Sequence, residues 1–285
     1  MIKTKSILSG LLFFFIIGIG CKKAVDQAEA TLTSRDLQNV SYGNHVRNSL
    51  DIYLPERRDA KTPVILLVHG GSWFEGDKSA FTDLAKYWRD KGYAAATMNY
   101  RFTNTPEKSI HPAQVNDIAK AIEFIGSKSA EWKISSDKFA LQGASAGAHL
   151  SLLFAYKYDT ANKVKAVISM AGPTDLTATG SAGTAQAQVV QWLIGSSYQA
   201  NPSAYAEASP ISHVTSNSKP TLLFHGKKDV VVPYQQAVDL KNKLVQFGTV
   251  HKLISYEDTG HEVINVNYMA SFLADCDNWF KLYLK

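Results

Sequence analysis

Cysteine is scarce in this sequence: its 285 residues include two, Cys21 and Cys276. Small exported domains often use paired cysteines to compensate for a limited core. Only Cys276 lies outside the N-terminal segment considered below. We therefore expect no internal disulfide, and a fold whose stability depends on its hydrophobic core.

Metal-ligand motifs and strong charge are lacking as well. The histidines and cysteines show neither H-E-x-x-H nor paired C-x-x-C spacing, so we expect no metal and no organic cofactor. The net charge of +5 is small and dispersed, which argues against a nucleic-acid partner. Hydrophobic residues make up 45% of the chain, enough for a large core, which excludes global disorder. No pattern specifies an oligomeric state.

The N-terminal apolar run is too short to span a membrane. It covers residues 7–20, whereas a spanning helix needs about 20 residues. The run follows Lys3 and Lys5 and ends at Cys21, an arrangement that resembles a bacterial lipoprotein signal. We predict a signal peptide at residues 1–20, a lipid on Cys21 that attaches the chain to a membrane, and a polar tether at 21–37. The expected location is the bacterial cell envelope, in the periplasm or at the cell surface. The alternatives are an ordinary signal with an incidental cysteine, or an uncleaved anchor.

Strand-like and helix-like segments alternate through residues 38–285, which we expect to form one domain. The strand-like segments are 49–54, 64–69, 94–99, 139–142, 164–170, 221–225 and 251–256. The helix-like segments are 81–91, 112–127, 147–157, 234–247 and 266–284. This alternation predicts an α/β fold with a mostly parallel central sheet of about eight strands and helices on both faces. The strands near residues 40 and 50 have no helix between them and are expected to form an antiparallel edge.

The segment at about 175–219 interrupts this alternation. It is rich in Ala, Ser, Gly and Thr. A connection of this length is usually either functional or disordered. We interpret it as an insertion that acts as a lid over the carboxyl edge of the sheet, with an unstructured surface loop as the alternative.

Ser145 is the candidate nucleophile. It lies in the stretch GASAG (143–147), between a predicted strand and a predicted helix. A sharp turn there would place the serine in a strained, positive-φ conformation, with its oxygen near the amino terminus of the helix. The G-x-S-x-G pattern alone is weak evidence, but its position between a strand and a helix favours a catalytic serine over an ordinary tight turn.

A serine hydroxyl needs a base and an orienting acid. His261 follows the last strand on a loop and is the best candidate for the base. Asp229 follows the strand at 221–225 and is the best candidate for the acid, giving the order Ser, Asp, His expected of α/β-hydrolases. Four other residues receive structural interpretations: a core histidine, a strand-end histidine, a carboxylate that opens the insertion, and a turn or cap carboxylate (His149, His225, Asp175 and Asp258).

The stretch VHGGSW (68–73) is the candidate source of oxyanion donors. Gly70 and Gly71 would let backbone amides approach a substrate closely, and His69 could support the loop from behind. The amide of Ala146, directly after the nucleophile, is the expected second donor. An ordinary glycine turn is the alternative.

Several stretches together resemble one family. HGGSW, NYR (99–101), HPAQVNDIAKAIEFI (111–125), GASAGAHL, AGPTDL and FHGKKDVVVPY occur in the order seen in α/β-hydrolase carboxylesterases, in the subgroup related to hormone-sensitive lipase and bacterial feruloyl/acetyl xylan esterases. The resemblance implies a triad of Ser145, Asp229 and His261. It also implies oxyanion donors at Gly70, Gly71 and Ala146, with Ser72 where many relatives carry a third glycine. Arg101 and Asp117 match family positions and are interpreted as fold-supporting.

The resemblance implies hydrolysis of carboxylic esters through an acyl-enzyme. Together with the export signal, it favours acetyl or feruloyl esters on polysaccharide or other small ester substrates. The pocket is expected to include Ser72, Trp73 and Trp192, with plain core aromatics as the alternative for the two tryptophans. The competing functions are an amidase or peptidase of the same fold (the H-G-G-x-W form is similar to that of kynurenine formamidases), a non-catalytic binding lipoprotein, and a structural envelope protein.

Overall fold

The computed structural model describes residue 1 and residues 32–284. The predicted signal peptide, the lipid site at Cys21 and most of the predicted tether lie outside the described residues. The first strand begins at Arg35, inside the range predicted for the tether. The folded domain therefore starts slightly earlier than the sequence suggests.

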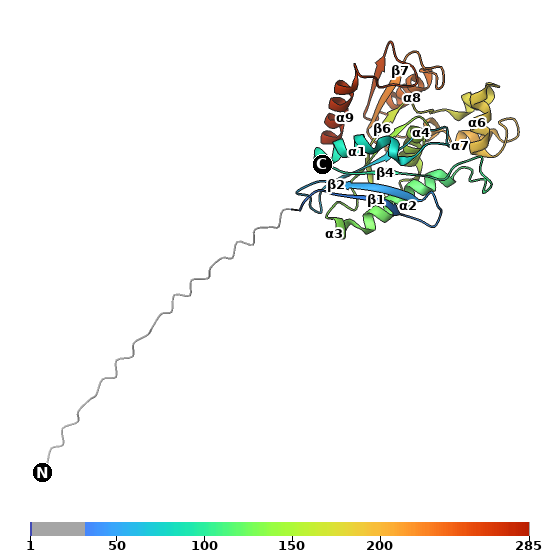
Figure 1. Ribbon diagram of the computed structural model, residues 1–285. Helices are drawn as coiled ribbons and strands as arrows, with labels where there is room; N and C mark the ends of the chain where they lie inside the picture. The colour runs from blue at the N-terminus through green and yellow to red at the C-terminus, as the bar shows by residue number, and fades with distance from the viewer. Residues whose placement is uncertain (2–31, 285) are drawn as a thin grey trace. The chain divides into compact units, whose positions relative to one another are not determined.

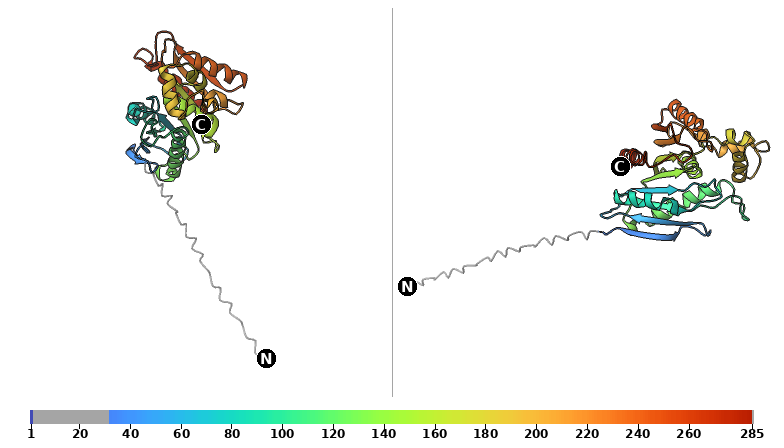
Figure 2. Two further views of the ribbon diagram at one scale, coloured as in Figure 1. Left: turned by 90° about the vertical axis from the view of Figure 1, so that its right-hand side faces the viewer. Right: turned by 45° about the horizontal axis from the view of Figure 1, so that its top comes forward.

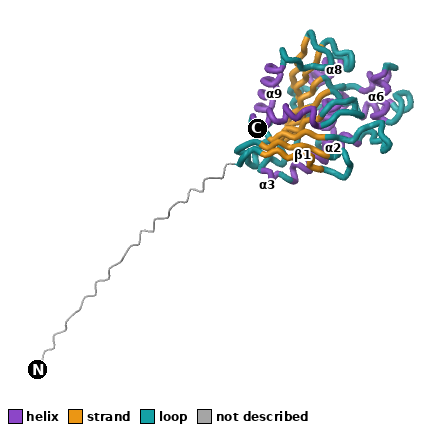
Figure 3. The backbone as a smooth tube through the Cα atoms, in the orientation of Figure 1, coloured by secondary structure: helices purple, strands orange, loops and turns teal. Residues whose placement is uncertain are grey.

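Eight strands form one sheet (Figures 1 and 3). They are β1 (Arg35–Ser41), β2 (Ser49–Leu54), β3 (Val64–Val68), β4 (Ala94–Met98), β5 (Phe139–Ala144), β6 (Val164–Met170), β7 (Thr221–Gly226) and β8 (His251–Tyr256). Their order is β1-β2-β4-β3-β5-β6-β7-β8. β2 pairs antiparallel with both β1 and β4, and the remaining pairs are parallel. The predicted α/β-hydrolase fold and its antiparallel edge are confirmed.

The central strand β3 is apolar throughout because both of its faces are covered. In β3, Ile65 and Leu67 pack on one face and Leu66 and Val68 on the other, as the two-residue period of a strand requires. β1 lies at the sheet edge and is largely exposed. This contrast explains why the central strands lack the alternating pattern of a half-exposed sheet.

Helices cover the two faces of the sheet (Figure 2). On one face, α1 (Thr82–Asp90) and α9 (Met269–Tyr283) bury Trp88 and Phe280. On the other face, α2 (Ala113–Ser127), α4 (Ala146–Leu153) and α8 (Gln235–Gln246) contribute Ile118, Leu150 and Leu240. The shorter helices are η1 (Lys78–Phe81), α3 (Ser129–Trp132) and η2 (Phe154–Tyr158), the last a π-helical turn that extends α4.

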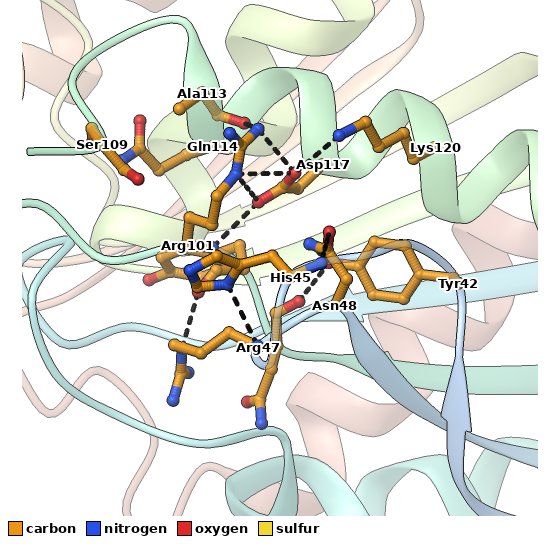
Figure 4. A network of polar contacts seen from close by, with 12 residues as sticks. Tyr42, His45, Arg47, Asn48, Arg101, Ser109, Ala113, Gln114, Asp117 and Lys120 are labelled. Carbon is orange, nitrogen blue, oxygen red and sulfur yellow. Dashed lines mark hydrogen bonds and ion pairs between the residues drawn. The ribbon is translucent and has the colours of Figure 1, made fainter. Parts of the chain in front are cut away.

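A buried ion pair joins the loop after β4 to α2 (Figure 4). Both carboxylate oxygens of Asp117 accept hydrogen bonds from the Arg101 guanidinium, and Arg101 also donates to the carbonyl of Ala113 at the start of α2. The Asp117 side chain is fully buried. These contacts join the loop after β4 to α2, which is consistent with the fold-supporting role expected of the pair.

The segment between β6 and β7 is mostly helical rather than an unstructured loop. It contains α5 (Leu176–Ser181), α6 (Ala185–Ile194), α7 (Pro202–Glu207) and η3 (Pro210–His213). α6 and α7 project at one end of the sheet (Figure 1). Side-chain oxygens of Asp175, Thr184 and Asn201 cap the amino ends of α5, α6 and α7. Asp175, interpreted above as the carboxylate that opens the insertion, thus caps the first helix of that insertion. In the part of the chain described, no helix has the length and apolar character needed to cross a bilayer.

Candidate active site

Ser145 lies in a sharp turn between β5 and α4. Its backbone has φ 50° and ψ −120°, the positive-φ conformation that the sequence predicts. The Ser145 amide donates to the carbonyl of Met170 at the end of β6, at 2.8 Å. The turn therefore has a fixed place at the carboxyl edge of the sheet, with the serine at the amino end of α4.

The two flanking glycines are required by backbone contacts. A Cβ at Gly143 would lie 2.4 Å from the carbonyl oxygen of Gly147, and a Cβ at Gly147 would lie 2.1 Å from the carbonyl oxygen of Val68. Real Cβ atoms do not approach oxygen so closely, and a backbone oxygen cannot swing aside. Glycine at these positions lets the nucleophile turn pack directly against the end of β3.

The structure brings together the three residues predicted as a triad. His261 Nε2 lies 2.9 Å from Ser145 Oγ, and His261 Nδ1 lies 2.8 Å from Asp229 Oδ2. Because Nδ1 faces a carboxylate, it carries the ring proton, and Nε2 is then free to accept the proton of the serine hydroxyl. Ser145 comes from the β5–α4 turn, Asp229 from the loop after β7 and His261 from the loop after β8. In the sequence, His261 lies 116 positions from Ser145 and 32 positions from Asp229.

Asp229 is held as a carboxylate. Burial alone would raise its pKa, but hydrogen bonds from His225, from His261 and from the Val232 amide outweigh burial and hold the pKa well below its ordinary value. The amides of Val231 and Val232 donate to Oδ1 at 2.8 and 2.9 Å. The acid is therefore ionised and its oxygens are fixed in direction.

His225 was not predicted as part of the site. The sequence indicated a strand-end packing residue, and the side chain is indeed buried at the end of β7. Its Nε2, however, lies 3.2 Å from Asp229 Oδ2 and 2.8 Å from the carbonyl oxygen of Val232. The spacing of four residues between His225 and Asp229 in the stretch HGKKD was the available signal.

The loop after β3 approaches the nucleophile closely. A Cβ at Gly70 would lie 3.3 Å from the Cβ of Ser145, and Gly71 has φ +106°. Ser72 and Trp73 also have positive φ values of 50° and 64°. In the turns and loops of the described residues, neither the Gly71 amide nor the Ala146 amide donates a hydrogen bond to a backbone carbonyl. They are therefore available to a ligand at Ser145.

His69 is buried and packs against this loop. His69 stacks on Tyr100 and its Nδ1 lies 2.6 Å from the Gly70 carbonyl oxygen. Burial lowers the pKa of His69 to about 4. Its predicted role of supporting the loop from behind is consistent with this packing.

His149 is the satisfied core histidine that the sequence predicts. Trp73 Nε1 donates to its Nδ1 at 3.2 Å, and its Nε2 lies 2.7 Å from the carbonyl oxygen of Ala208. In the neutral ring that carries its proton on Nε2, both nitrogens therefore have a hydrogen-bond partner. Burial lowers the pKa of His149 to about 3. The ring connects the glycine-rich loop to the segment between β6 and β7.

Ser145 stands between two cavities. The first, which we call the insertion-side cavity, has a volume of about 200 Å³ and is bounded by the glycine-rich loop, by α5 and by α6. The second, the histidine-side cavity, has a volume of about 700 Å³ and lies between α1, the loop of His261 and α9. Ser145, Ser72 and Val231 line both.

The predicted pocket residues are only partly placed at these cavities. Ser72 and Trp73 line the insertion-side cavity. Trp192 lines neither cavity, because its ring packs edge-on against Phe74 with centroids 5.4 Å apart. The same helix, α6, instead presents Gln186 and Val190, four residues apart, to the cavity. The sequence indicated the right helix but not which of its faces lines the cavity.

The remaining candidates have other partners. Asp258, interpreted above as a turn or cap carboxylate, accepts a hydrogen bond from the hydroxyl of Tyr268 at 2.5 Å. Cys276 is buried and unpaired by a disulfide. Within residues 32–284, no group of three or more His, Cys, Asp or Glu side chains is arranged to hold a metal ion.

Several known proteins are similar to this chain in sequence and in fold. Residues 50–244 match the BD-FAE family, and the chain belongs to that family. Curated relatives include the probable carboxylic ester hydrolase LipM of Mycobacterium tuberculosis (27% identity, 73% of this chain, 51% of the relative) and esterase LipQ of the same organism (30%, 70% and 50%). The isoprenylcysteine alpha-carbonyl methylesterase ICME of Arabidopsis thaliana is 24% identical over 79% of this chain and 56% of its own. This chain thus spans about half the length of these relatives.

Solved structures confirm the fold. A truncated carbohydrate esterase from gut microbiota superimposes with a TM-score of 0.75 at 25% identity, over 86% of this chain and 96% of its own. Esterase 2 of Thermogutta terrifontis superimposes with a TM-score of 0.70 at 19% identity, over 88% and 92%. Both are similar to this chain along nearly the whole described domain.

Proposed function

We propose that this protein is a serine hydrolase that cleaves carboxylic esters through a triad of Ser145, His261 and Asp229. The observation that carries the proposal is the continuous hydrogen-bond chain from Ser145 Oγ to His261 Nε2 and from His261 Nδ1 to Asp229 Oδ2, at 2.9 and 2.8 Å. The esterase names of the relatives support the same reaction class.

The mechanism proceeds in two halves. His261 removes the Ser145 proton while Oγ attacks the ester carbonyl. The backbone amides of Gly70, Gly71 and Ala146 stabilise the oxyanion. His261 then gives the proton to the departing alcohol, leaving an acyl-serine. Water repeats the sequence with His261 as base and releases the acid. Asp229 keeps the imidazole oriented and stabilises its positive charge in both halves.

We propose acetyl or feruloyl esters of polysaccharide as the natural substrates. The carbohydrate esterase that superimposes on this chain supports that class. Export and lipid attachment at Cys21 remain predictions from the sequence, as does the closing of the β6–β7 segment as a lid.

The first experiment compares Ser145→Ala with Ser127→Ala, an exposed serine at the end of α2. We expect p-nitrophenyl acetate hydrolysis and fluorophosphonate labelling to disappear in Ser145→Ala and to persist in Ser127→Ala, with equal melting temperatures. Substantial turnover in folded Ser145→Ala would contradict the proposed nucleophile. Parallel assays on acetylated xylan, an N-formyl substrate and a peptide separate the esterase from an amidase or peptidase.

A further inference from the structure

Ser145 lies where two cavities of different size and chemistry meet, and His261 lines only the larger one. We propose that the insertion-side cavity holds the acyl group of the ester and that the histidine-side cavity holds the alcohol. The assignment rests on the proposed function and specifies its substrate class: a short acyl group joined to an uncharged alcohol with a substantial apolar surface.

The position of the base sets the direction of the ester. The leaving alcohol oxygen must receive its proton from His261 Nε2, so the alcohol must lie within hydrogen-bond reach of that nitrogen. His261 lines the histidine-side cavity and not the other. The alcohol therefore extends toward α1 and α9.

The acyl group then takes the opposite side. Its carbonyl carbon is bonded to Ser145 Oγ, and its oxygen points at the amides of Gly71 and Ala146. Gly71 lines the histidine-side cavity and Ala146 lines the insertion-side cavity, so the oxyanion lies between the two. With the alcohol in the histidine-side cavity, the acyl substituent is left with the insertion-side cavity beneath α5 and α6.

Cavity size limits the acyl group. The insertion-side cavity has about 200 Å³, and a dry cavity of about 150 Å³ is sufficient for benzene. Val189 and Val190 on α6 narrow this cavity, and the hydrogen bond of 3.0 Å from Gln236 Nε2 to Thr179 Oγ1 joins two of its walls. Short acyl groups fit this space, whereas a chain of eight carbons must displace the valine side chains of α6 or extend beyond the cavity.

The larger cavity sets the chemistry of the alcohol. Its lining is largely apolar, and includes Leu84 on α1 and Leu273 on α9. Its charged members are three carboxylates, Glu75, Asp83 and Glu262, with no lysine or arginine among the lining residues. An anionic alcohol would face repulsion there, whereas a neutral one buries apolar surface. A neutral sugar can meet this requirement through the apolar face of its ring, and a uronate cannot.

Two ester series test the two cavities separately. In the alcohol series all substrates are acetates, and we expect kcat/KM to be about tenfold higher for hexyl than for ethyl acetate through added apolar burial. The anionic 6-acetoxyhexanoate should lose this gain. In the acyl series all substrates are ethyl esters, and ethyl octanoate should fall at least about tenfold below ethyl butyrate, because overpacking a filled cavity is costly.

Matched variants assign each series to its cavity. Val189→Phe should lower the butyrate-to-acetate ratio and leave the hexyl-to-ethyl ratio as it is. Leu273→Gln, with Leu84→Gln as a second variant, should lower the hexyl-to-ethyl ratio and leave the acyl ratio as it is. The controls are Val245→Phe and Leu282→Gln, both exposed and outside both cavities.

The cavity assignment is supported if Val189→Phe changes only the acyl series and Leu273→Gln changes only the alcohol series. The reverse pattern, with Val189→Phe acting on the alcohol series and Leu273→Gln on the acyl series, overturns it, and so do two series without chain-length dependence. If Ser145→Ala keeps full turnover, the proposed function fails; loss of turnover in Ser145→Ala together with the reverse pattern rejects only the cavity assignment.

Discussion

His225 Nε2 lies 3.2 Å from Oδ2 of Asp229, the same oxygen that His261 Nδ1 contacts at 2.8 Å. The nitrogen also faces the Val232 carbonyl oxygen at 2.8 Å. With two acceptors in front of it, Nε2 carries a proton and donates. Asp229 Oδ2 thus receives one donor from each side, and His225 is a positioning residue for the carboxylate that orients His261.

Replacing His225 separates donation from packing. His225→Leu removes the donor, and we expect kcat to fall about tenfold with little change in KM, because the loss of a hydrogen bond to a charged group is expressed in the orientation of His261. His225→Gln places an amide donor near the former Nε2 and should recover most of the activity. Steady-state kinetics on p-nitrophenyl acetate provide the measurement. Equal activity of the Leu and Gln variants would reject the positioning role.

The identity of the acid is tested by comparing Asp229, which contacts His261, with Asp258, which precedes His261 closely in the sequence. Asp229→Asn should lower kcat by about 10⁴, the loss expected when an amide replaces the carboxylate and favours the wrong imidazole tautomer. Asp258→Asn should keep near-normal kcat, because Asp258 contacts Tyr268. Comparable losses in both variants would contradict the assignment of Asp229.

The sequence predicted those parts of the site that follow from strand order. Each of Ser145, Asp229 and His261 lies in the turn or loop that follows a strand, and the carboxyl ends of parallel strands meet at one edge of a sheet. Residue spacing around Ser145 also predicted its positive φ. The apolar sequence of β3 is likewise typical of a strand covered on both faces.

Features that depend on packing between distant segments could not be read from the sequence. The contact between His225 and Asp229 depends on the path of the chain between them, and the packing of Trp192 on Phe74 depends on the rotation of α6. The two cavities arise because α5 and α6 approach Ser145 from one side and α9 from the other. No local pattern contains such distances.

His149 should make stability depend on pH. Its pKa in the folded state is about 3, below the ordinary value of about 6.5, because burial disfavours the charged ring. The unfolded chain therefore binds more protons below pH 6.5, so stability falls as the pH drops from 6.5 toward 3. Between pH 7 and pH 5 this one residue should account for a loss of about 2 kcal/mol.

Denaturant unfolding at pH 7 and pH 5 measures this contribution. In His149→Gln, which retains a donor and an acceptor but does not titrate, the difference between the two pH values should be about 2 kcal/mol smaller than in the wild type. The half-buried His251 at the start of β8 serves as the control, and the loss of pH dependence in His149→Gln should exceed that in His251→Gln. An unaltered pH dependence in His149→Gln would show that the ring is not held neutral.

The glycine at position 147 should contribute strongly to the stability of the fold. In Gly147→Ala the new Cβ would meet the Val68 carbonyl oxygen at 2.1 Å and that of His69 at 2.4 Å, so β3 and α4 must separate. We expect the free energy of unfolding to fall by about 3 kcal/mol.

The control is Gly126→Ala near the end of α2, where the new Cβ would lie 3.3 Å from its nearest neighbouring atom. The higher helix propensity of alanine should offset this tighter contact, so the free energy of unfolding should change by no more than about 1 kcal/mol. Guanidinium unfolding of both variants provides the comparison. If Gly147→Ala were as stable as the wild type, the close packing of the nucleophile turn on β3 would be wrong, and with it the explanation of why glycine occupies both sides of Ser145.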